Sequence, residues 1–539
     1  MKLATVPRPS VGRASPIMAM CVAASVARIV ALGVSVCVTL SACTSVGPDF
    51  RQPDVTLEDQ WLESLPRAAQ SAPAAQAAWW TAFDDPVLSA LEARAVQRNL
   101  SVQVAGLHIF KARAQLATSE DNLLPQSGSV SAGADHINTS GVGPLPPTHL
   151  WAEHLRVNAG WEIDFWGKYR RQIESDRAQL RASEAAYDNA LVSLFGDVAN
   201  AYIDLRTLDQ RIVVAQQNLQ SVQRSLALTQ SRYKHGAATQ LDVEQAATLV
   251  AETEAQIPPL VKARAQDRDT LAVLLADRPA DIDAQLQGST AIPVAPTQID
   301  VGIPADLLRR RPDVRQAALN AAAQSALIGA AKAKLYPSLS LTGLFGLSSG
   351  EQHGIGLTQW GSKTIGLFSA GITVPILDRA QLKNAVRAQD AAFQEAVFDY
   401  QSTVLQAQKE VEDAIAALRT SLDALAASVR AADASQRALR LANAQYRAGS
   451  ITYDPVLDAS RSALRDGDAL AQNQGLAALA AVSLYRALGG GWEVAQGQQV
   501  VSEQIAAQMA RRTDWGHLVN PPAHSTLARA NVTQPENGK

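Results

Sequence analysis

The chain has 539 residues, with 48 Lys and Arg against 51 Asp and Glu, and a formal net charge of −3. Hydrophobic residues make up 47% of it but aromatic residues only 5%, a composition that favours close helix–helix packing over a bulky globular core. A mildly acidic chain without basic blocks argues against nucleic-acid binding.

Residues 1–42 are predicted to be a signal peptide. This segment is positively charged, contains no acidic residue, and includes an apolar run, Ile29–Ala42, that is too short for a transmembrane helix. The run ends Leu40-Ser41-Ala42-Cys43, which resembles a bacterial lipobox with Cys43 as the lipidated first residue of the mature protein. The alternative is a chance cysteine near an ordinary cleavage site. The three cysteines are Cys21 and Cys37 in this segment and Cys43 directly after it, so a lipidated Cys43 leaves the mature chain without a free thiol or disulfide.

The segment 43–85 is loop-like and rich in proline. Helical spacing then runs from Val87 to about Leu123. A hairpin is predicted over about 126–166, with a glycine- and proline-rich loop at Asn138–Thr148. Its return strand alternates apolar and polar residues. That pattern fits either a soluble sandwich, with the apolar face in a core, or a barrel, with that face toward lipid.

A long helical stretch, Lys168–His235, ends at Gly236, which suits the left-handed position after a helix. A further helix is predicted from about Gln240 to Ala276, because Thr239 and Asp242 form a capping-box pattern. A proline-containing connector, 277–304, leads to Arg309-Arg310-Arg311-Pro312. The three arginines are interpreted as a solvated turn, with an anion site as the alternative.

The pattern then starts again. A weak strand at Pro337–Leu347, a loop at Ser348–Thr358 and an alternating return strand predict a second hairpin over about 337–375. The 73 residues from Ile376 to Ala448 contain neither proline nor glycine and carry a heptad-like apolar stripe. One helix of this length would span roughly 110 Å. Gly449 suits its end, and Asp454-Pro455 suits an N-cap followed by a proline at the first helical position.

The chain therefore contains two similar halves, 86–276 and 305–488. Tyr233-Lys234-His235-Gly236 matches Tyr446-Arg447-Ala448-Gly449 at an offset of 213 residues. A unit this long indicates a duplicated pair and not a solenoid. Residues 489–539 are interpreted as a C-terminal segment followed by a polar, disordered tail from about Thr513.

Four features of the sequence belong together: the lipobox, the segment Trp79-Trp80…Phe83…Asp85-Pro86, the duplicated halves, and Ala487-Leu488-Gly489-Gly490-Gly491-Trp492. Together they resemble the TolC-like outer-membrane efflux channels, most closely the OprM/NodT lipoprotein branch. The resemblance covers roughly residues 43–492. It implies an α+β membrane protein, a homotrimer in which four strands per chain close a twelve-stranded outer-membrane β-barrel that long helices continue across the periplasm. It also places the segments 43–85 and 489–539 in an equatorial region.

The resemblance also implies a periplasmic gate at the turns that follow the long helices, marked by Gly236 and Gly449. The family's constriction positions fall on Asp458 and Arg461, with Asp454 one turn earlier and Asp242 in the corresponding region of the first half. Residues 454, 458 and 461 share one helix face, and threefold symmetry would make each a ring. The alternative is that Asp454 and Asp242 only cap helices and that Asp458 and Arg461 form a solvated pair.

The expected function is a passive, gated outer-membrane duct that exports small toxic compounds or drugs. An inner-membrane pump would drive it through a periplasmic adaptor protein, and Cys43 would anchor it in outer-membrane lipid. The alternatives are a duct for type I protein secretion and a periplasmic coiled-coil spacer without a pore. The sequence carries no HExxH, phosphate-binding loop or G-x-S-x-G motif, so no catalytic residue, metal or cofactor is predicted.

Overall fold

The computed structural model describes residues 45–55, 60–63, 77–139, 148–287, 291–296, 299, 309–354 and 357–519. The predicted signal peptide and Cys43 lie outside these ranges, as do residues 520–539 of the predicted tail. The chain divides into two compact units. One consists of residues 1–49, 120–172 and 326–388, and the other of residues 50–119, 173–325 and 389–539.

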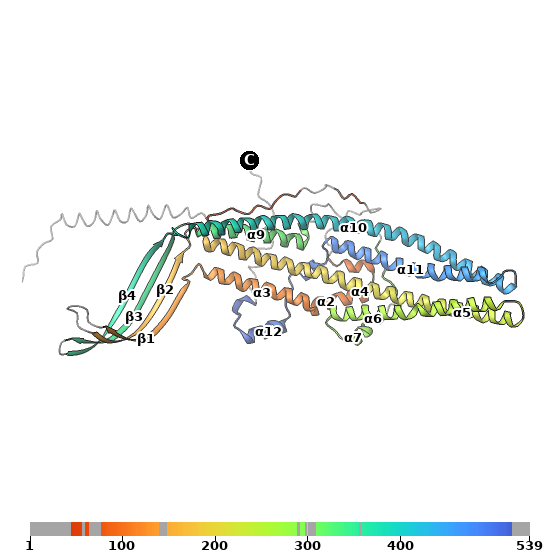
Figure 1. Cartoon of the computed structure of the whole chain (residues 1–539), viewed down its shortest axis with the longest axis horizontal. Coiled ribbons are helices and arrows are strands. Elements are labelled where there is room, and N and C mark those ends of the chain that lie inside the picture. The colour runs from red at the N-terminus through yellow and green to blue at the C-terminus, as the bar shows by residue number, and fades with distance from the viewer. Residues whose placement is uncertain are drawn as a thin grey trace, which may run out of the picture. The chain divides into compact units, whose positions relative to one another are not determined.

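The described elements are mostly helical, and two of the helices are far longer than the others (Figure 1). No helix within the described ranges has an apolar stretch long enough to cross a membrane. In chain order the elements are η2 (Trp79–Phe83), α2 (Pro86–Arg98), α3 (Leu100–Asp121), β1 (Ser127–Thr139), β2 (Thr148–Ile163), α4 (Lys168–Lys234), α5 (Gln240–Ala255), α6 (Ile257–Leu274), α7 (Pro279–Gln285), α9 (Pro312–Ala333), β3 (Ser338–Gly354), β4 (Leu357–Thr373), α10 (Arg379–Ala448), α11 (Asp454–Ala487), η3 (Trp492–Ala495), α12 (Glu503–Arg512) and η4 (Gly516–Leu518).

The described strands form one antiparallel sheet in the order β1-β2-β3-β4. Both predicted hairpins are present. The predicted loop Ser348–Thr358 is wrong, because β3 continues to Gly354 and β4 begins at Leu357. Its serine and glycine residues are typical of loops, but pairing between the two strands overrides this weak local preference.

The strand register collects most of the large exposed apolar side chains on one face of the sheet, with Ile365 and Leu367 of β4 on the other. Val157 of β2 lies opposite Val130 of β1 and Phe345 of β3. Directly opposed residues project to the same face, so the next residue, Arg156, shares the other face with Ser131. The apolar face is exposed in the single chain. Its large exposed members are Val130, Trp151, Leu155, Val157, Trp161, Phe345, Leu347, Phe368 and Ile372.

The long helices α4 and α10 match the stretches that heptad spacing predicts, but two other predicted helices are interrupted. Asn99 separates α2 from α3: its Nδ2 donates to the Leu274 carbonyl (2.9 Å), and its Oδ1 accepts from the Val102 amide (3.0 Å). A side chain that satisfies backbone groups in this way favours a helix boundary. Gln256 separates α5 from α6, because Pro258 and Pro259 begin a new helix more easily than they continue one. The predicted connector 277–304 also contains a helix, α7.

The main core of the second unit surrounds the aromatic residues of η2. Trp79 stacks on Tyr485 of α11 with ring centroids 5.2 Å apart, and Trp80 lies against Phe195 of α4 at 4.5 Å. Arg311 also lies in this unit and is only 7% exposed, so its interpretation as part of a solvated turn is wrong. Its guanidinium donates to the Ala487 carbonyl (2.5 Å) and pairs with Glu410 (2.7 Å). These partners come from distant sequence, which explains why local polarity did not reveal the burial.

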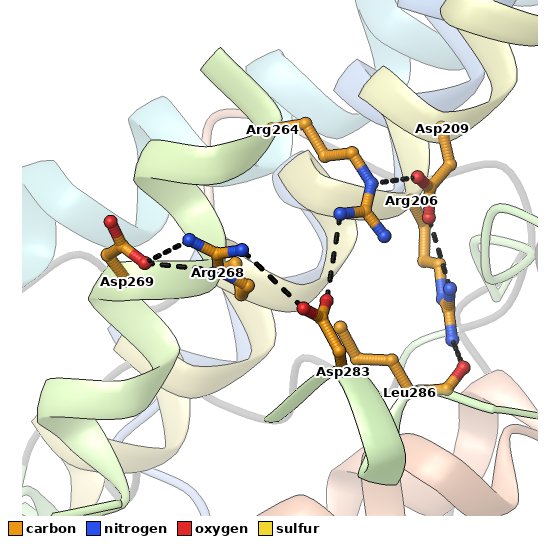
Figure 2. Close-up of polar contacts among 7 residues, drawn as sticks. All are labelled: Arg206, Asp209, Arg264, Arg268, Asp269, Asp283 and Leu286. Atoms are coloured by element: carbon orange, nitrogen blue, oxygen red, sulfur yellow. Dashed lines mark hydrogen bonds and ion pairs between the residues drawn. The ribbon is translucent and has the colours of Figure 1, made fainter. Parts of the chain in front are cut away.

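A chain of ion pairs connects α4, α6 and α7 beside this core. Figure 2 shows Asp209 between Arg206 and Arg264, and Asp283 between Arg264 and Arg268. Arg206 is the most buried member, at 2% exposure, and also donates to the Leu286 carbonyl at 2.6 Å. The residues after α6 are thereby tied to the long helix α4.

Candidate functional site

The candidate gate region lies in the second unit, where α4 and α10 end and α5 and α11 begin. Gly236 and Gly449 follow the long helices with φ angles of 73° and 79°. In this left-handed conformation the chain turns back, and the Ala237 amide donates to the Arg232 carbonyl (2.8 Å) while the Ser450 amide donates to the Gln445 carbonyl (3.0 Å). The sequence predicted these glycine conformations.

The first turn leads into α5 through the predicted capping box. The Thr239 hydroxyl accepts from the Asp242 amide (3.2 Å), and the Asp242 carboxylate accepts from the Thr239 amide (2.8 Å). This reciprocal pair satisfies two amides that the first helical turn leaves free. Asp242 therefore has a structural role as a cap, and its role in a gate stays a prediction.

The second turn differs from its prediction. Asp454 is the first residue of α11, and Tyr453 occupies the N-cap without a side-chain capping bond. Tyr453 is only 1% exposed, and its ring lies edge-on to Tyr446 with centroids 5.6 Å apart. Packing of this tyrosine thus fixes where the helix begins. The exposed Asp454 carboxylate instead lies in the first turn, where negative charge interacts favourably with the helix dipole.

Asp454, Asp458 and Arg461 are all exposed, whereas Val456, Leu457 and Ser460 of the same helix are buried. The three candidate gate side chains therefore lie on the face of α11 that is turned away from the core of its own chain. Arg461 is near Glu252 of α5, with Nη2 3.9 Å from Oε2. Such an exposed pair contributes little to stability. The partner of Arg461 in the structure is thus Glu252 and not the Asp458 of the solvated-pair alternative.

Arg232 is the residue of this region that sequence reasoning missed. Its guanidinium donates to the Tyr446 carbonyl and to the Ala237 carbonyl (3.3 Å), and it lies 4.4 Å from the centroid of the Tyr446 ring. The Tyr446 hydroxyl in turn donates to the Thr229 hydroxyl at 3.5 Å. One signal was available: a basic residue in the last helical turn often donates to free carbonyls at a helix end.

A small apolar cluster supports these contacts. It consists of Val222, Ala246, Leu249, Ala442, Tyr446, Tyr453, Val456 and Leu457. Burial raises the pKa of the Tyr453 hydroxyl, and the neighbouring Ser225 side chain opposes that rise. Within the described ranges, no group of three His, Cys, Asp or Glu side chains could hold a metal ion.

Known proteins resemble this arrangement in sequence and in fold. A sequence model of the family described as "Outer membrane efflux protein" matches residues 91–277 and 303–490. The chain belongs to this family. The resemblance inferred from the lipobox, the Trp79–Pro86 segment and the two halves is thereby confirmed at the level of the family.

Individual relatives extend over most of the chain. "Nodulation protein T" of Rhizobium leguminosarum bv. viciae is 33% identical over 429 residues, which is 78% of this chain and 85% of that protein. "Probable efflux pump outer membrane protein TtgC" of Pseudomonas putida is 30% identical over 466 residues, 85% of this chain and 95% of that protein. The solved structure of the outer-membrane channel OprN has a TM-score of 0.75 and 31% identity, covering 84% of this chain and all of that one.

Proposed function

We propose that this chain is the outer-membrane duct of a tripartite efflux system, through which small toxic compounds or drugs leave the cell. Membership of the outer membrane efflux protein family supports this role, as does the relative described as an efflux pump outer membrane protein. The duct itself performs no covalent chemistry. An inner-membrane pump supplies the work, and a periplasmic adaptor docks at the turns after the long helices.

The observation that carries the proposal is the exposed apolar face of the sheet. Leu155 lies opposite Leu347 and Ile163 lies opposite Leu339, so the nine-residue stretches 155–163 and 339–347 run side by side. Tilted strands of about 9–11 residues span a membrane. Beyond Leu155 the same face carries Glu153, opposite Ser349, which suits the edge of an apolar band. We infer that this face contacts lipid and that the opposite face, with Arg156 and Asn158, lines the passage.

The proposed assembly is a homotrimer with a twelve-stranded barrel. Each copy would contribute four strands, and β4 of one copy would pair with β1 of the next, because these two strands form the sheet edges. The long helices would continue the duct into the periplasm. The two matched segments of the family model and the shared order helix, hairpin, long helix support the proposed duplication of residues 86–276 and 305–488.

The resting gate is proposed to lie at the face of α11 that carries Asp454, Asp458 and Arg461, with Asp242 near the start of α5. Three copies of each exposed carboxylate would form a ring that favours cations electrostatically. Lipidation of Cys43 would hold the N-terminus at the outer membrane.

Two adjacent residues of β2 provide the test. Val157 and Asn158 project to opposite faces, so Val157→Arg would place a charge in lipid, at a cost of about 2–4 kcal/mol near the bilayer midplane. Asn158→Arg would place the same charge in the passage. We expect Val157→Arg to lower the amount of trimer in outer membranes and Asn158→Arg to leave it unchanged. Equal amounts would contradict the assignment of faces.

Two further measurements separate the remaining alternatives. Single-particle images of the detergent-extracted protein should show a threefold hollow tube, whereas a solid rod would favour the pore-less spacer. A deletion strain should become more sensitive to drugs and regain tolerance when the gene is restored. Normal tolerance together with loss of a secreted protein would favour type I secretion.

A further inference from the structure

The first described residues form a short strap, Ser45–Asp49, that is held by the beginning of α4. The Val46 amide donates to the Trp166 carbonyl at 3.1 Å. Arg171, only 5% exposed, donates to the carbonyls of Val46 (3.3 Å) and Gly47 (3.4 Å) and pairs with the Asp49 carboxylate (2.8 Å). Hydrogen bonds from a charged guanidinium are stronger than those between neutral groups, although the Asp49 carboxylate itself is 89% exposed. The strap is therefore bound at several points along its length.

Two glycines bring the strap into backbone contact with α9. Gly47 has a φ of 112°, which an L side chain rarely adopts. A Cβ on Gly329 of α9 would lie 2.6 Å from the Val46 carbonyl oxygen and 2.9 Å from the Arg171 side chain. A side chain at either position would displace the strap. The sequence of α9 is thus adapted to hold this segment against the helix surface.

A cavity of about 610 Å³ lies beside the strap, where the strands meet the helices of the same unit. Trp166 and Tyr336 stack in its wall with centroids 4.6 Å apart, and the Trp166 indole donates to the Pro337 carbonyl at 2.8 Å. Its volume is typical of a site for a small ligand. Ile376 and Leu377 also line it and are 76% and 94% exposed in the single chain. The wall is mixed, because Glu162 and Lys168 form an ion pair in it at 2.9 Å, and the two neighbouring exposed apolar side chains offer a surface that an apolar group could cover.

We propose that this cavity is the seat of the fatty acyl group carried by Cys43. Trp166 belongs to the cavity wall, and its carbonyl also accepts the bond from the Val46 amide, so the described start of the strap lies next to the cavity wall. Cys43 precedes Ser45 by two residues, a reach of about 7 Å at full extension. The inference rests on the proposed outer-membrane placement and on lipidation of Cys43.

The seat gives the strap a function. One acyl chain binds a membrane only marginally, and burial of each methylene group contributes about 0.8 kcal/mol. An acyl chain seated against Trp166, Ile376 and Leu377 would fix the anchor at the base of the strands. Arg171 and Gly329 act as positioning residues, since they hold the strap and do not line the cavity.

Photochemical cross-linking of the lipidated full-length protein tests the seat. Benzoylphenylalanine replaces Leu377, the protein is irradiated in outer membranes, and its peptides are analysed by mass spectrometry. We expect an adduct between the peptide containing position 377 and the lipidated N-terminal peptide. The same probe at Leu441 of α10, 64% exposed in the other unit, should give none.

Two variants then ask whether the strap delivers the lipid. Arg171→Ala and Gly329→Val should each lower the adduct yield about tenfold, the factor that corresponds to about 1.4 kcal/mol. Arg387→Ala removes an exposed arginine that, within the described residues, bonds only Asn384 of its own helix, and it should leave the yield unchanged. The amount of protein in outer membranes shows whether each variant folds. If Gly329→Val does not fold, Arg171→Ala alone provides the test.

Other outcomes would overturn the proposal. They are an adduct with free phospholipid only, an adduct with a second copy of the chain, or an N-terminal peptide without lipid. The proposed duct is judged separately by drug tolerance of the complemented deletion strain. Full tolerance without the adduct would reject the seat and keep the duct, and the reverse result would keep the seat and reject the duct.

Discussion

Arg232 at the end of α4 donates a hydrogen bond to the main-chain carbonyl of Tyr446 at the end of α10, and its guanidinium also covers the Tyr446 ring. One side chain thus joins the last turns of the two longest helices. The carbonyls at a helix end lack partners within the helix, so this contact satisfies a group that water would otherwise solvate. The ends of α4 and α10 are consequently expected to open together.

Arg232→Ala should loosen the helix ends without unfolding the chain. Loss of the hydrogen bond and of the cation–π contact removes about 1–2 kcal/mol of local stability. Amide hydrogen exchange over residues 444–452 should therefore accelerate about tenfold. Arg224→Ala is the control, because Arg224 is exposed on the same helix and, in the part of the chain that the structure describes, bonds only the carbonyl of Gln220. Equal exchange in both variants would show that Arg232 does not hold the ends together.

Removing Asp458 and Arg461 together should raise the resting conductance of the channel in planar bilayers, if these residues form the closed gate. Glu252→Ala shows whether the double variant acts through the side chains of α11 or through loss of the contact between α11 and α5. It removes the partner of Arg461 and leaves α11 unchanged. A gate formed by rings on α11 predicts a small effect of Glu252→Ala. Unchanged conductance of the double variant would remove both residues from the gate.

Arg206→Ala should destabilise the second unit by about 1–3 kcal/mol, since it leaves the buried carbonyl of Leu286 without its donor. Arg268 belongs to the same chain of ion pairs but is 27% exposed (Figure 2). Arg268→Ala should cost at most about 1 kcal/mol. Denaturant unfolding of the two variants measures the difference. Similar losses would mean that burial does not determine the contribution of each arginine.

Glu92 predicts a specific pH dependence of stability. It is fully buried, and neither carboxyl oxygen has a hydrogen-bond partner in the described part of the chain. Burial, with a smaller contribution from Asp197, raises the pKa of this carboxyl well above its usual value. The folded state therefore retains the proton more tightly than the unfolded state. The stabilisation that this tighter proton binding gives the folded state is complete below about pH 4.3, the pKa of an unperturbed glutamate. It is lost as the pH rises through the pKa of Glu92 in the folded state.

Glu92→Gln should remove this dependence. We expect a higher unfolding temperature than the wild type above neutral pH and a similar one near pH 4, because glutamine has nearly the same shape without an ionisable proton. Glu395→Gln changes an exposed side chain of α10 and should show no comparable difference. A pH profile of Glu92→Gln that parallels the wild type would contradict the prediction.

The sequence predicts the long helices and both hairpins because their signals are local. Heptad spacing without proline or glycine is sufficient for α10, and strict alternation is sufficient for β2. Predictions failed where distant groups decide the outcome. Asn99 interrupts a helical pattern because it bonds Leu274, and Arg311 is buried because Ala487 and Glu410 surround it.

In the candidate gate, too, features that depend on neighbouring residues were predicted, and features that depend on contacts between helices were not. The capping box of Thr239 and Asp242 and the turn at Gly449 depend on a few neighbouring residues, and both are present as predicted. The start of α11 depends on burial of Tyr453 in a cluster that includes Val222 of α4 and Ala246 of α5, contacts that local sequence does not specify. Arg232 was missed for the same reason, since its acceptor lies 214 residues further along the chain.

The open edges of the sheet have a consequence for biogenesis. In the described part of a single copy, β1 bonds only β2 and β4 bonds only β3, so each leaves one row of amides and carbonyls unpaired. Long unpaired edges recruit any available strand. If the proposed trimer forms, a newly exported copy is prone to aggregation until its sheet edges pair with those of other copies. Cells that make this protein are expected to need a periplasmic chaperone that shields the edges. A copy with a proline in the middle of β1 should block the assembly of wild-type copies made in the same cell.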